Sequence, residues 1–347
     1  MLGFISFSSR WKCPKPNSNV RSLIKRKWRG LNQQRGLSLQ GVGGVVAPPV
    51  DCSVTVEQAV RMWTRCFQQH GISEPLLSSQ YIIAHVLGNK TLESVERRRL
   101  QERLTDQERE NVWTLCFKRL TRMPVQYVIE EWDFRDLTLK MRPPVFIPRP
   151  ETEELVSLVL EDLLVEQGKR TLRCLEVGCG SGAISLSLLH SMSELKAIAL
   201  DQSKDAVGLT KENASRLGLQ DRLEVHHLDI MKDADLIVGD FSPVDVLVSN
   251  PPYLFHQDME SLQAEILRFE DHTALDGGLD GMSVIRQILA LATKLLRDKG
   301  RVYLEVDPRH PPLIKHLVEK SRTGLKYLRA HYDFTNRLRF CILQKEE

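Results

Sequence analysis

The chain has 347 residues, of which 42% are hydrophobic, and its formal net charge is +3. A chain of this length can form two domains with buried cores. It contains no run of about 18 apolar residues, which argues against a membrane-spanning helix. The seven cysteines form no Cys-x-x-Cys pair and no cluster with histidine, which argues against a disulfide framework or a zinc site.

The first 50 residues differ in composition from the rest of the chain. They contain nine lysines and arginines, no aspartate or glutamate, and many serines. This composition is typical of an organellar transit peptide, although a nucleic-acid-binding arm or a leader without function would look similar. Glycines and prolines over 41–49 predict a linker. Beyond residue 50 the net charge is −6, from 39 basic and 45 acidic residues, which argues against a nucleic-acid surface spread over the main body.

Residues 51–123 are predicted to form a small helical domain. Thr55 with Gln58, and Thr105 with Glu108, have the spacing of capping boxes at helix starts. Apolar residues recur at helical spacing after each box. We expect one helix to run from Thr55 until Gly71 ends it, and further helices over about 75–87, 92–103 and 106–121.

The next segment, residues 124–149, is predicted to be a β-hairpin that links two domains. Pro124 should stop the helices, and apolar residues then alternate over 125–129, 137–141 and 145–147, as in strands. Pro150 fits the first position of a helix, and the acids after it favour a helix N-terminus. That helix should extend to Gln167.

From Thr171 to the end, strands and helices alternate. This predicts an α/β domain over 150–347, a Rossmann-like, mostly parallel seven-stranded sheet covered on both faces, with an antiparallel hairpin as its last pair. We expect strands over 172–177, 196–201, 223–228, 244–249, 301–306, 325–332 and 337–344. We expect helices over about 182–191, 203–217, 283–298 and 311–322.

The first of these strands enters a glycine loop, residues 178–182, with the sequence Gly-Cys-Gly-Ser-Gly. Such a loop lets a ligand approach the backbone closely. Its spacing is not the G-x-G-x-x-G of dinucleotide sites, and Glu176 would repel a pyrophosphate. A carboxylate at this position suits a cationic ligand instead. Cys179 is interpreted as a small filler residue and not a nucleophile, because no base with an orienting partner is visible around it.

Two further acids end neighbouring strands. Asp201 is placed to accept hydrogen bonds from a ribose diol, and Asp229 to bind an adenine amino group. Each acid alone could be a solvated strand terminus. Together with Glu176 and the glycine loop, they fit S-adenosylmethionine (SAM).

The tetrapeptide Asn250-Pro251-Pro252-Tyr253 follows an apolar strand. Proline has no N–H and fixes φ, so the carbonyls of Asn250 and Pro251 are held out of any strand pairing. Two acceptors and an aromatic ring at one point suit a planar NH2 group. The simpler alternative is a Pro-Pro turn followed by a packing tyrosine.

With these motifs placed, the chain resembles class I SAM-dependent methyltransferases. More narrowly, it resembles the HemK (PrmC) family of protein-glutamine N5-methyltransferases, which act on class I peptide-chain release factors. The resemblance covers about residues 55–345. Besides the helical domain and the glycine loop, it rests on Pro124-Val125-Gln126-Tyr127, Phe146-Ile147-Pro148-Arg149-Pro150-Glu151-Thr152-Glu153, Asn250-Pro251-Pro252-Tyr253 and Arg268-Phe269-Glu270 with Ala274-Leu275.

The residues and the resemblance together give roles to particular residues, and no metal is expected. The expected cofactor-binding residues are Glu176, Gly178, Cys179, Gly180, Ser181, Gly182, Asp201, Asp229, Ile230 and Asn250. Ile230 is included as an aliphatic contact to adenine, where some relatives have an aromatic residue. The expected catalytic residues are Asn250, Pro251 and Tyr253, and the expected substrate contacts are Asn250, Pro251, Pro252, Tyr253 and Arg149. For Arg149, Glu151 and Glu153, helix capping and surface ion pairing are the alternative.

The expected reaction is methyl transfer from SAM to the side-chain nitrogen of the glutamine in a Gly-Gly-Gln motif. With the leader, this predicts a monomeric enzyme of the mitochondrial matrix whose partners are mitochondrial class I release factors, without direct nucleic-acid or membrane binding. The helical domain would grip the protein substrate. Methylation of an exocyclic base amine in DNA or RNA uses the same NH2 geometry but needs a basic channel. An inactive cofactor-binding scaffold is a third alternative.

Overall fold

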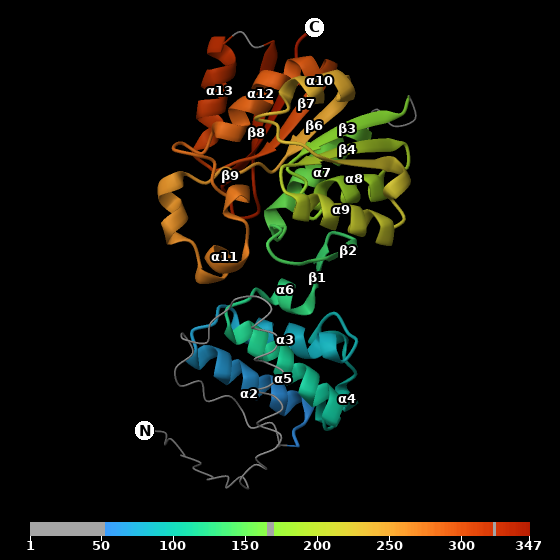
Figure 1. Cartoon of the computed structure of the whole chain (residues 1–347), viewed down its shortest axis with the longest axis vertical. Helices are drawn as coiled ribbons and strands as arrows, with labels where there is room; N and C mark the ends of the chain where they lie inside the picture. The colour runs from blue at the N-terminus through green and yellow to red at the C-terminus, as the bar shows by residue number, and fades with distance from the viewer. Residues whose placement is uncertain (1–52, 165–169, 322–323) are drawn as a thin grey trace. The chain divides into compact units, whose positions relative to one another are not determined.

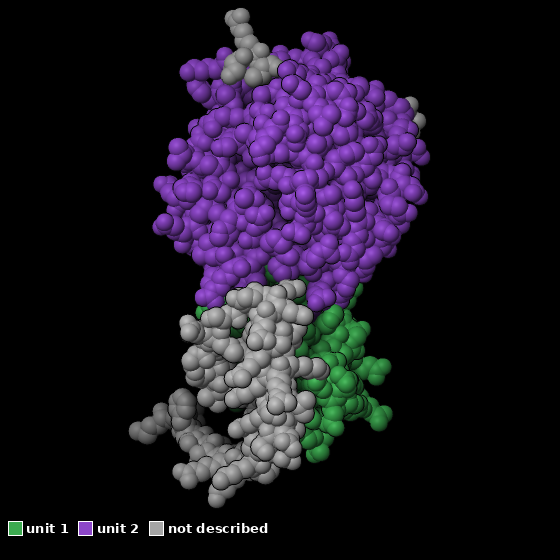
Figure 2. All heavy atoms as spheres, in the orientation of Figure 1, with its two compact units in different colours: residues 1–128 green, residues 129–347 purple. Residues whose placement is uncertain are grey.

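The computed structural model describes residues 53–164, 170–321 and 324–347. The chain divides into two compact units, Met1–Val128 and Ile129–Glu347 (Figure 2). The predicted leader lies outside the described residues. No helix in the described ranges is long and apolar enough to cross a membrane.

The first unit is built from α2 (Val56–Gln69), α3 (Pro75–Val86), α4 (Arg97–Gln101) and α5 (Asp106–Leu120). Both predicted capping boxes form, at the starts of α2 and α5. Trp63 of α2 packs edge-to-face on Trp113 of α5, with ring centroids 5.3 Å apart. The predicted helix over 92–103 is wrong. The chain forms a 3-10 turn, η2 (Leu92–Ser94), and then α4, because Val95 adopts extended backbone between them.

The prediction of a strand over 125–129 is also wrong, because Val125–Ile129 forms the short helix α6. The carbonyl of Pro124 accepts hydrogen bonds from the backbone N–H groups of Tyr127 and Val128, at 3.1 and 3.0 Å. Proline therefore starts this helix, as its fixed φ allows. The hairpin consists of the antiparallel strands β1 (Glu131–Phe134) and β2 (Leu137–Lys140).

The second unit contains the predicted seven-stranded sheet, in the order β5-β4-β3-β6-β7-β9-β8 (Figure 1). Its strands are β3 (Leu172–Val177), β4 (Leu195–Asp201), β5 (Leu223–His227), β6 (Val244–Ser249), β7 (Leu296–Glu305), β8 (Leu325–Tyr332) and β9 (Leu338–Lys345). The first five strands are parallel to one another, and β9 is antiparallel to β7 and β8. The chain proceeds outward from β3 on one side and from β6 on the other. Ligands bind at such switch points, beyond the carboxyl ends of the strands.

Helices cover both faces of the sheet. Leu175 and Val177 of β3 belong to a large core cluster with α10 (Ala234–Phe241), α12 (Ser283–Leu295) and α13 (His310–Ser321). Glu176, between them in sequence, points to the opposite face and bonds to α8 (Ala183–Ser191). The helices α7 (Pro150–Leu164) and α9 (Lys204–Arg216) also contact strands of the sheet (Figure 1).

The boundary between α12 and β7 differs from the sequence prediction. The helix expected over 283–298 ends at Leu295, because Leu296 already pairs with Val244 of β6 at the start of β7. The helix expected to extend to Gln167 is described to Leu164, and the remainder of that prediction lies outside the described residues. The helices α10 and α11 (Ala264–Phe269) were not predicted.

Candidate active site

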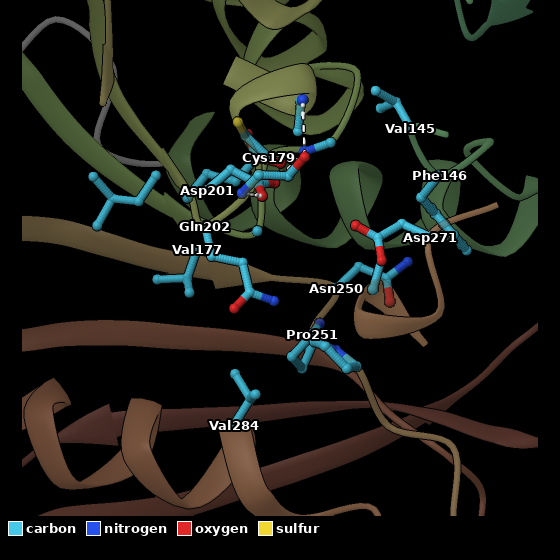
Figure 3. Close-up of a pocket in the computed structure, with 18 of the residues that line it drawn as sticks. Val145, Phe146, Val177, Cys179, Asp201, Gln202, Asn250, Pro251, Asp271 and Val284 are labelled. Atoms are coloured by element: carbon cyan, nitrogen blue, oxygen red, sulfur yellow. Dashed lines mark hydrogen bonds between the residues drawn. The ribbon is translucent and has the colours of Figure 1, made fainter. Parts of the chain in front are cut away.

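A pocket opens at the switch point, beyond the carboxyl ends of β3, β4 and β6 (Figure 3). Of the predicted cofactor-binding residues, those that line it are Glu176, Gly178, Cys179, Gly180, Ser181, Asp201, Asp229, Ile230 and Asn250. Pro251 and Pro252 line it as well. Gly182, Tyr253 and Arg149 are not among its lining residues. The pocket therefore gathers most of the predicted site from segments far apart in the sequence.

Asp201, at the end of β4, is fixed by backbone donors. Its two carboxylate oxygens accept hydrogen bonds from Gly180 N–H at 2.9 Å and Ser203 N–H at 2.8 Å. Burial raises the pKa of Asp201 although these two bonds oppose the shift. The carboxylate thus links the glycine loop to the start of α9 and fixes their relative positions.

Gly182, the last residue of the glycine loop, is packed closely against α8 and α9. Its φ is +84°, and an added Cβ would lie 2.9 Å from Leu186 Cδ1 and 3.0 Å from Thr210 Cγ2. A side chain here would therefore be strained and would collide with α8 and α9. The residue serves the close packing of the loop and does not contact the pocket.

Glu176 is buried beneath the glycine loop. Its Oε2 accepts hydrogen bonds from the Ser185 backbone N–H at 3.0 Å and from the Ser185 hydroxyl. Burial raises the pKa of Glu176 to about 8, against the effect of these bonds. The carboxyl group is therefore largely protonated at neutral pH, and a nearby cation would favour its charged form.

The remaining predicted cofactor contacts, Asp229, Ile230 and Cys179, also line the pocket. Asp229 accepts a hydrogen bond from Met231 N–H at 2.9 Å and pairs with Lys232 Nζ at 2.7 Å. Burial opposes ionisation of Asp229, but these partners lower its pKa overall. Ile230 is buried and supplies an apolar surface. Burial raises the pKa of Cys179 well above its ordinary value, which makes it a poor nucleophile.

Asn250 is held in place at its amide. The end of β6 is tied to β3 by the Ser249 hydroxyl, which donates to the Val177 carbonyl at 2.6 Å. Asn250 Nδ2 donates to the Thr152 hydroxyl at 3.1 Å. Among the described residues, Asn250 Oδ1 has no hydrogen-bond partner, and the residue lines the pocket beside Pro251 (Figure 3). An acceptor is therefore left for a ligand.

Two residues that were given no role in the sequence analysis support this arrangement, although one of them, Thr152, lies in the motif 146–153. The Thr152 hydroxyl donates to Glu305 Oε2 at 2.7 Å, and the Tyr253 hydroxyl donates to Glu305 Oε1 at 3.1 Å. Glu305 is buried, and burial raises its pKa to about 7. An acid that ends a buried apolar strand is the one sequence signal that could have drawn attention to Glu305.

Arg149 makes an ion pair with Glu270 at the border of the pocket. Its Nη2 lies 2.7 and 2.9 Å from the two oxygens of Glu270, a buried residue that also accepts from Ile147 N–H at 3.3 Å. The neighbours Phe146 and Asp271 line the pocket (Figure 3). Arg149 thus joins the two segments that flank the pocket, and its partner is a buried carboxylate instead of a surface acid.

These residues fit SAM. Backbone N–H groups and small residues of the glycine loop allow close approach, Asp201 lies at the end of the second strand, and Glu176 can face positive charge. Further polar lining comes from residues that were not predicted, namely Gln202, Ser203, Asp271 and Thr273. In the described part of the chain, no group of three or more His, Cys, Asp or Glu residues could hold a metal ion.

The fold and the pocket define a class I SAM-dependent methyltransferase. Family models for the PrmC N-terminal domain and the methyltransferase small domain match residues 58–129 and 138–323. The chain is 47% identical over 303 residues to the human MTRF1L release factor glutamine methyltransferase, covering 86% of this chain and 90% of that protein. It belongs to the family of release factor glutamine methyltransferases, as its motifs predicted.

Other similarities are more distant. The release factor glutamine methyltransferase of Streptococcus pneumoniae is 36% identical over 231 residues, which cover 65% of this chain and 78% of that protein. Among solved structures, a release factor-specific protein-(glutamine-N5) methyltransferase from Alicyclobacillus acidocaldarius is 22% identical and has a TM-score of 0.37, covering 60% of this chain and all of that one.

Proposed function

We propose that this protein transfers a methyl group from SAM to the side-chain N5 of the glutamine in the Gly-Gly-Gln motif of mitochondrial class I release factors. The observation that carries the proposal is the orientation of the Asn250 side-chain amide. Its Nδ2 donates a hydrogen bond to Thr152, and its Oδ1 remains available to a ligand in the pocket beside Pro251. The names of the relatives, release factor glutamine methyltransferases, support the choice of substrate.

The chemical difficulty lies in the amide nitrogen, whose lone pair is delocalised. When bound, SAM supplies an electrophilic methyl group on a positively charged sulfur. Asn250 Oδ1 and the Pro251 carbonyl would each accept a hydrogen bond from one N–H group of the substrate amide. These two bonds would fix the direction from which the nitrogen approaches the methyl group, and they would favour positive charge on the nitrogen. Orientation of this kind can lower a barrier by roughly 7–11 kcal/mol in favourable cases. The nitrogen–carbon bond would form as the sulfur–methyl bond breaks, the sulfur would keep that electron pair, and the nitrogen would release one proton to solvent.

The helical unit is proposed to recognise the release factor. Two adjacent leucines of this unit, Leu76 and Leu77 of α3, are 50% and 46% exposed and offer an apolar contact.

The leader is proposed to direct the enzyme to the mitochondrial matrix, because it contains nine basic and no acidic residues. A monomer is the proposed working form.

A mass-spectrometric assay tests the proposal. Residues 50–347 are incubated with SAM and a recombinant mitochondrial release factor, and the peptides are mapped. We expect a gain of one methyl group, confined to the glutamine of Gly-Gly-Gln. Methyl transfer to DNA or RNA, with no modified release factor, would instead favour the exocyclic-amine alternative.

Asn250→Ala is the first variant to test. We expect methylation to fall by about 100-fold or more, because the contacts to the amide strengthen as charge develops. Cofactor affinity, measured by calorimetry, should change by less than about threefold. Gln220→Ala, at an exposed site of η3 (Gln220–Arg222) in the second unit and outside the pocket lining, is the matched control and should behave as wild type. A parallel collapse of cofactor affinity in Asn250→Ala would contradict the assigned role.

A further inference from the structure

We propose that Thr152 and Glu305 are positioning residues that set which end of the Asn250 amide faces the substrate. The proposal rests on the function assigned above and concerns how the acceptor of the pocket is kept in place. Neither residue would touch the reacting atoms; both would act through Asn250.

The three residues form a continuous hydrogen-bonded relay. Glu305 Oε2 accepts from the Thr152 hydroxyl at 2.7 Å, and the Thr152 oxygen accepts from Asn250 Nδ2 at 3.1 Å. Thr152 is 3% exposed and Glu305 is 1% exposed. Thr152 lies in the first turn of α7, Asn250 in the loop after β6, and Glu305 at the end of β7, so the fold brings the three residues together.

The direction of the relay follows from the number of hydrogens. A threonine hydroxyl has one hydrogen, and here Glu305 takes it. Thr152 can then only accept a bond from Asn250, which must present its NH2 group and not its carbonyl oxygen. Reversal of the amide would place two acceptors against each other in a buried site, which is unfavourable because neither acceptor would have a donor. Oδ1 is therefore left for the substrate.

The surroundings of Glu305 act in opposite directions on its charged, accepting state. Tyr253 donates to its other oxygen at 3.1 Å, Arg339 of β9 favours the charged form, and Glu151 of α7 opposes it. Burial is the largest influence and raises the pKa of Glu305 to about 7. Once protonated, Glu305 could donate to Thr152, the hydroxyl hydrogen would be free to bond Asn250 Oδ1, and the amide could reverse.

The test compares Thr152→Val, Thr152→Ser and Glu305→Gln. Valine removes the hydroxyl at nearly constant volume, serine keeps it, and glutamine offers an NH2 donor where the carboxylate only accepts. We expect kcat for the release factor to fall about 10- to 100-fold in Thr152→Val and Glu305→Gln, with the KM for SAM nearly unchanged, and Thr152→Ser to stay within about threefold of wild type. Thr293→Val, on α12 and outside the pocket lining, is the matched control.

The pH profile separates positioning from simple packing. In the wild type, kcat should rise with pH through about 7 as Glu305 loses its proton, and Glu305→Gln should lack this inflection. Wild-type turnover in Thr152→Val, or an unchanged inflection in Glu305→Gln, would overturn the relay. If Thr152→Val does not fold, Glu305→Gln with its pH profile decides the question alone.

A measurement without substrate distinguishes failure of the relay from failure of the proposed function. The side-chain NH2 resonances of Asn250, assigned by their loss in Asn250→Ala, report the bond to Thr152. We expect them to shift and exchange faster with water in Thr152→Val, but not in Thr152→Ser. Unchanged resonances in Thr152→Val would refute the relay. If the wild type does not methylate the release factor while the resonances respond as expected, only the substrate assignment fails.

Discussion

Gly182 is a single residue whose replacement should affect both stability and cofactor binding. An added Cβ would meet Leu186 and Thr210, at a φ of +84° that side chains rarely adopt. We expect Gly182→Ala to lower the free energy of unfolding by about 1–3 kcal/mol and to weaken SAM binding at least tenfold, as measured by urea unfolding and calorimetry.

The matched control is Gly218→Ala. Gly218 also has a positive φ of +68°, but an added Cβ would have no neighbour within 4 Å. This variant should lose about 1 kcal/mol of stability from backbone strain and keep the SAM affinity of the wild type. Equal losses of affinity in both variants would mean that the packing of Gly182 has no special role in the pocket.

Glu176 should make stability depend on pH. Its pKa of about 8 in the folded chain exceeds the ordinary value of 4.5, so between these values the folded protein holds a proton that the unfolded chain has lost. Stability from this group is therefore complete below about pH 4.5 and declines as pH rises to about 8, by up to about 1.4 kcal/mol per pH unit.

Urea unfolding of the wild type and Glu176→Gln at several pH values measures this contribution. The advantage of the wild type relative to the variant should shrink between pH 5 and 8. Calorimetry of SAM binding in buffers of different ionisation enthalpy should also detect proton release near pH 7 in the wild type alone. A stability difference that does not change with pH would contradict the raised pKa.

At the scale of elements, the ion pair of Arg149 and Glu270 joins the segment before α7 to the segment after α11. Arg149→Ala leaves the buried carboxylate of Glu270 without its cation. We expect a loss of about 1–3 kcal/mol in the free energy of unfolding, less than for a fully buried pair because Arg149 is partly exposed. Arg142→Ala, which breaks an exposed pair with Glu212, should cost less than about 1 kcal/mol. Urea unfolding compares the two.

The outcome also decides between two roles for Arg149. If the arginine contacts the release factor directly, Arg149→Ala would leave stability unchanged and raise only the KM for the protein substrate. Loss of stability together with an unchanged KM would assign it to the pocket border.

The elements that the sequence predicted well have strong, repeated patterns. The strands β3, β6 and β8 have the predicted bounds, because each is a short run with clear ends. The prediction failed at 125–129, where alternation typical of a strand occurs in a helix started by Pro124. It also missed α10, since eight residues provide too few turns for a periodic pattern.

The candidate site could be predicted where its residues are adjacent in sequence. The glycine loop, the acids at strand ends and Asn250 with its prolines were identified in this way, and their gathering in one pocket follows from the parallel sheet. The roles of Thr152 and Glu305 could not be predicted, because their hydrogen bond joins residues that are 153 positions apart in the sequence. Only the folded chain reveals such a pair.

For the whole molecule, we expect the leader to decide where the enzyme works. The full chain fused to a fluorescent protein should enter mitochondria, because its first 50 residues combine basic and apolar side chains without acids. A chain that begins at residue 51 should remain in the cytosol. A control with the five basic residues of 25–35 changed to glutamine should import poorly. Import of the chain without its leader would contradict this expectation.

The relay of Thr152, Asn250 and Glu305 also has a consequence for how this protein can change over generations. The three positions share one task, so losing any one of them removes most of what the other two provide, and effects of combined substitutions should be far from additive. A lineage that has lost Thr152 is then under little selection to retain Glu305. The buried side chain of Glu305 would then lower the stability of the fold without a compensating role, and an apolar replacement would be favoured. We therefore expect the three positions to be retained together or replaced together.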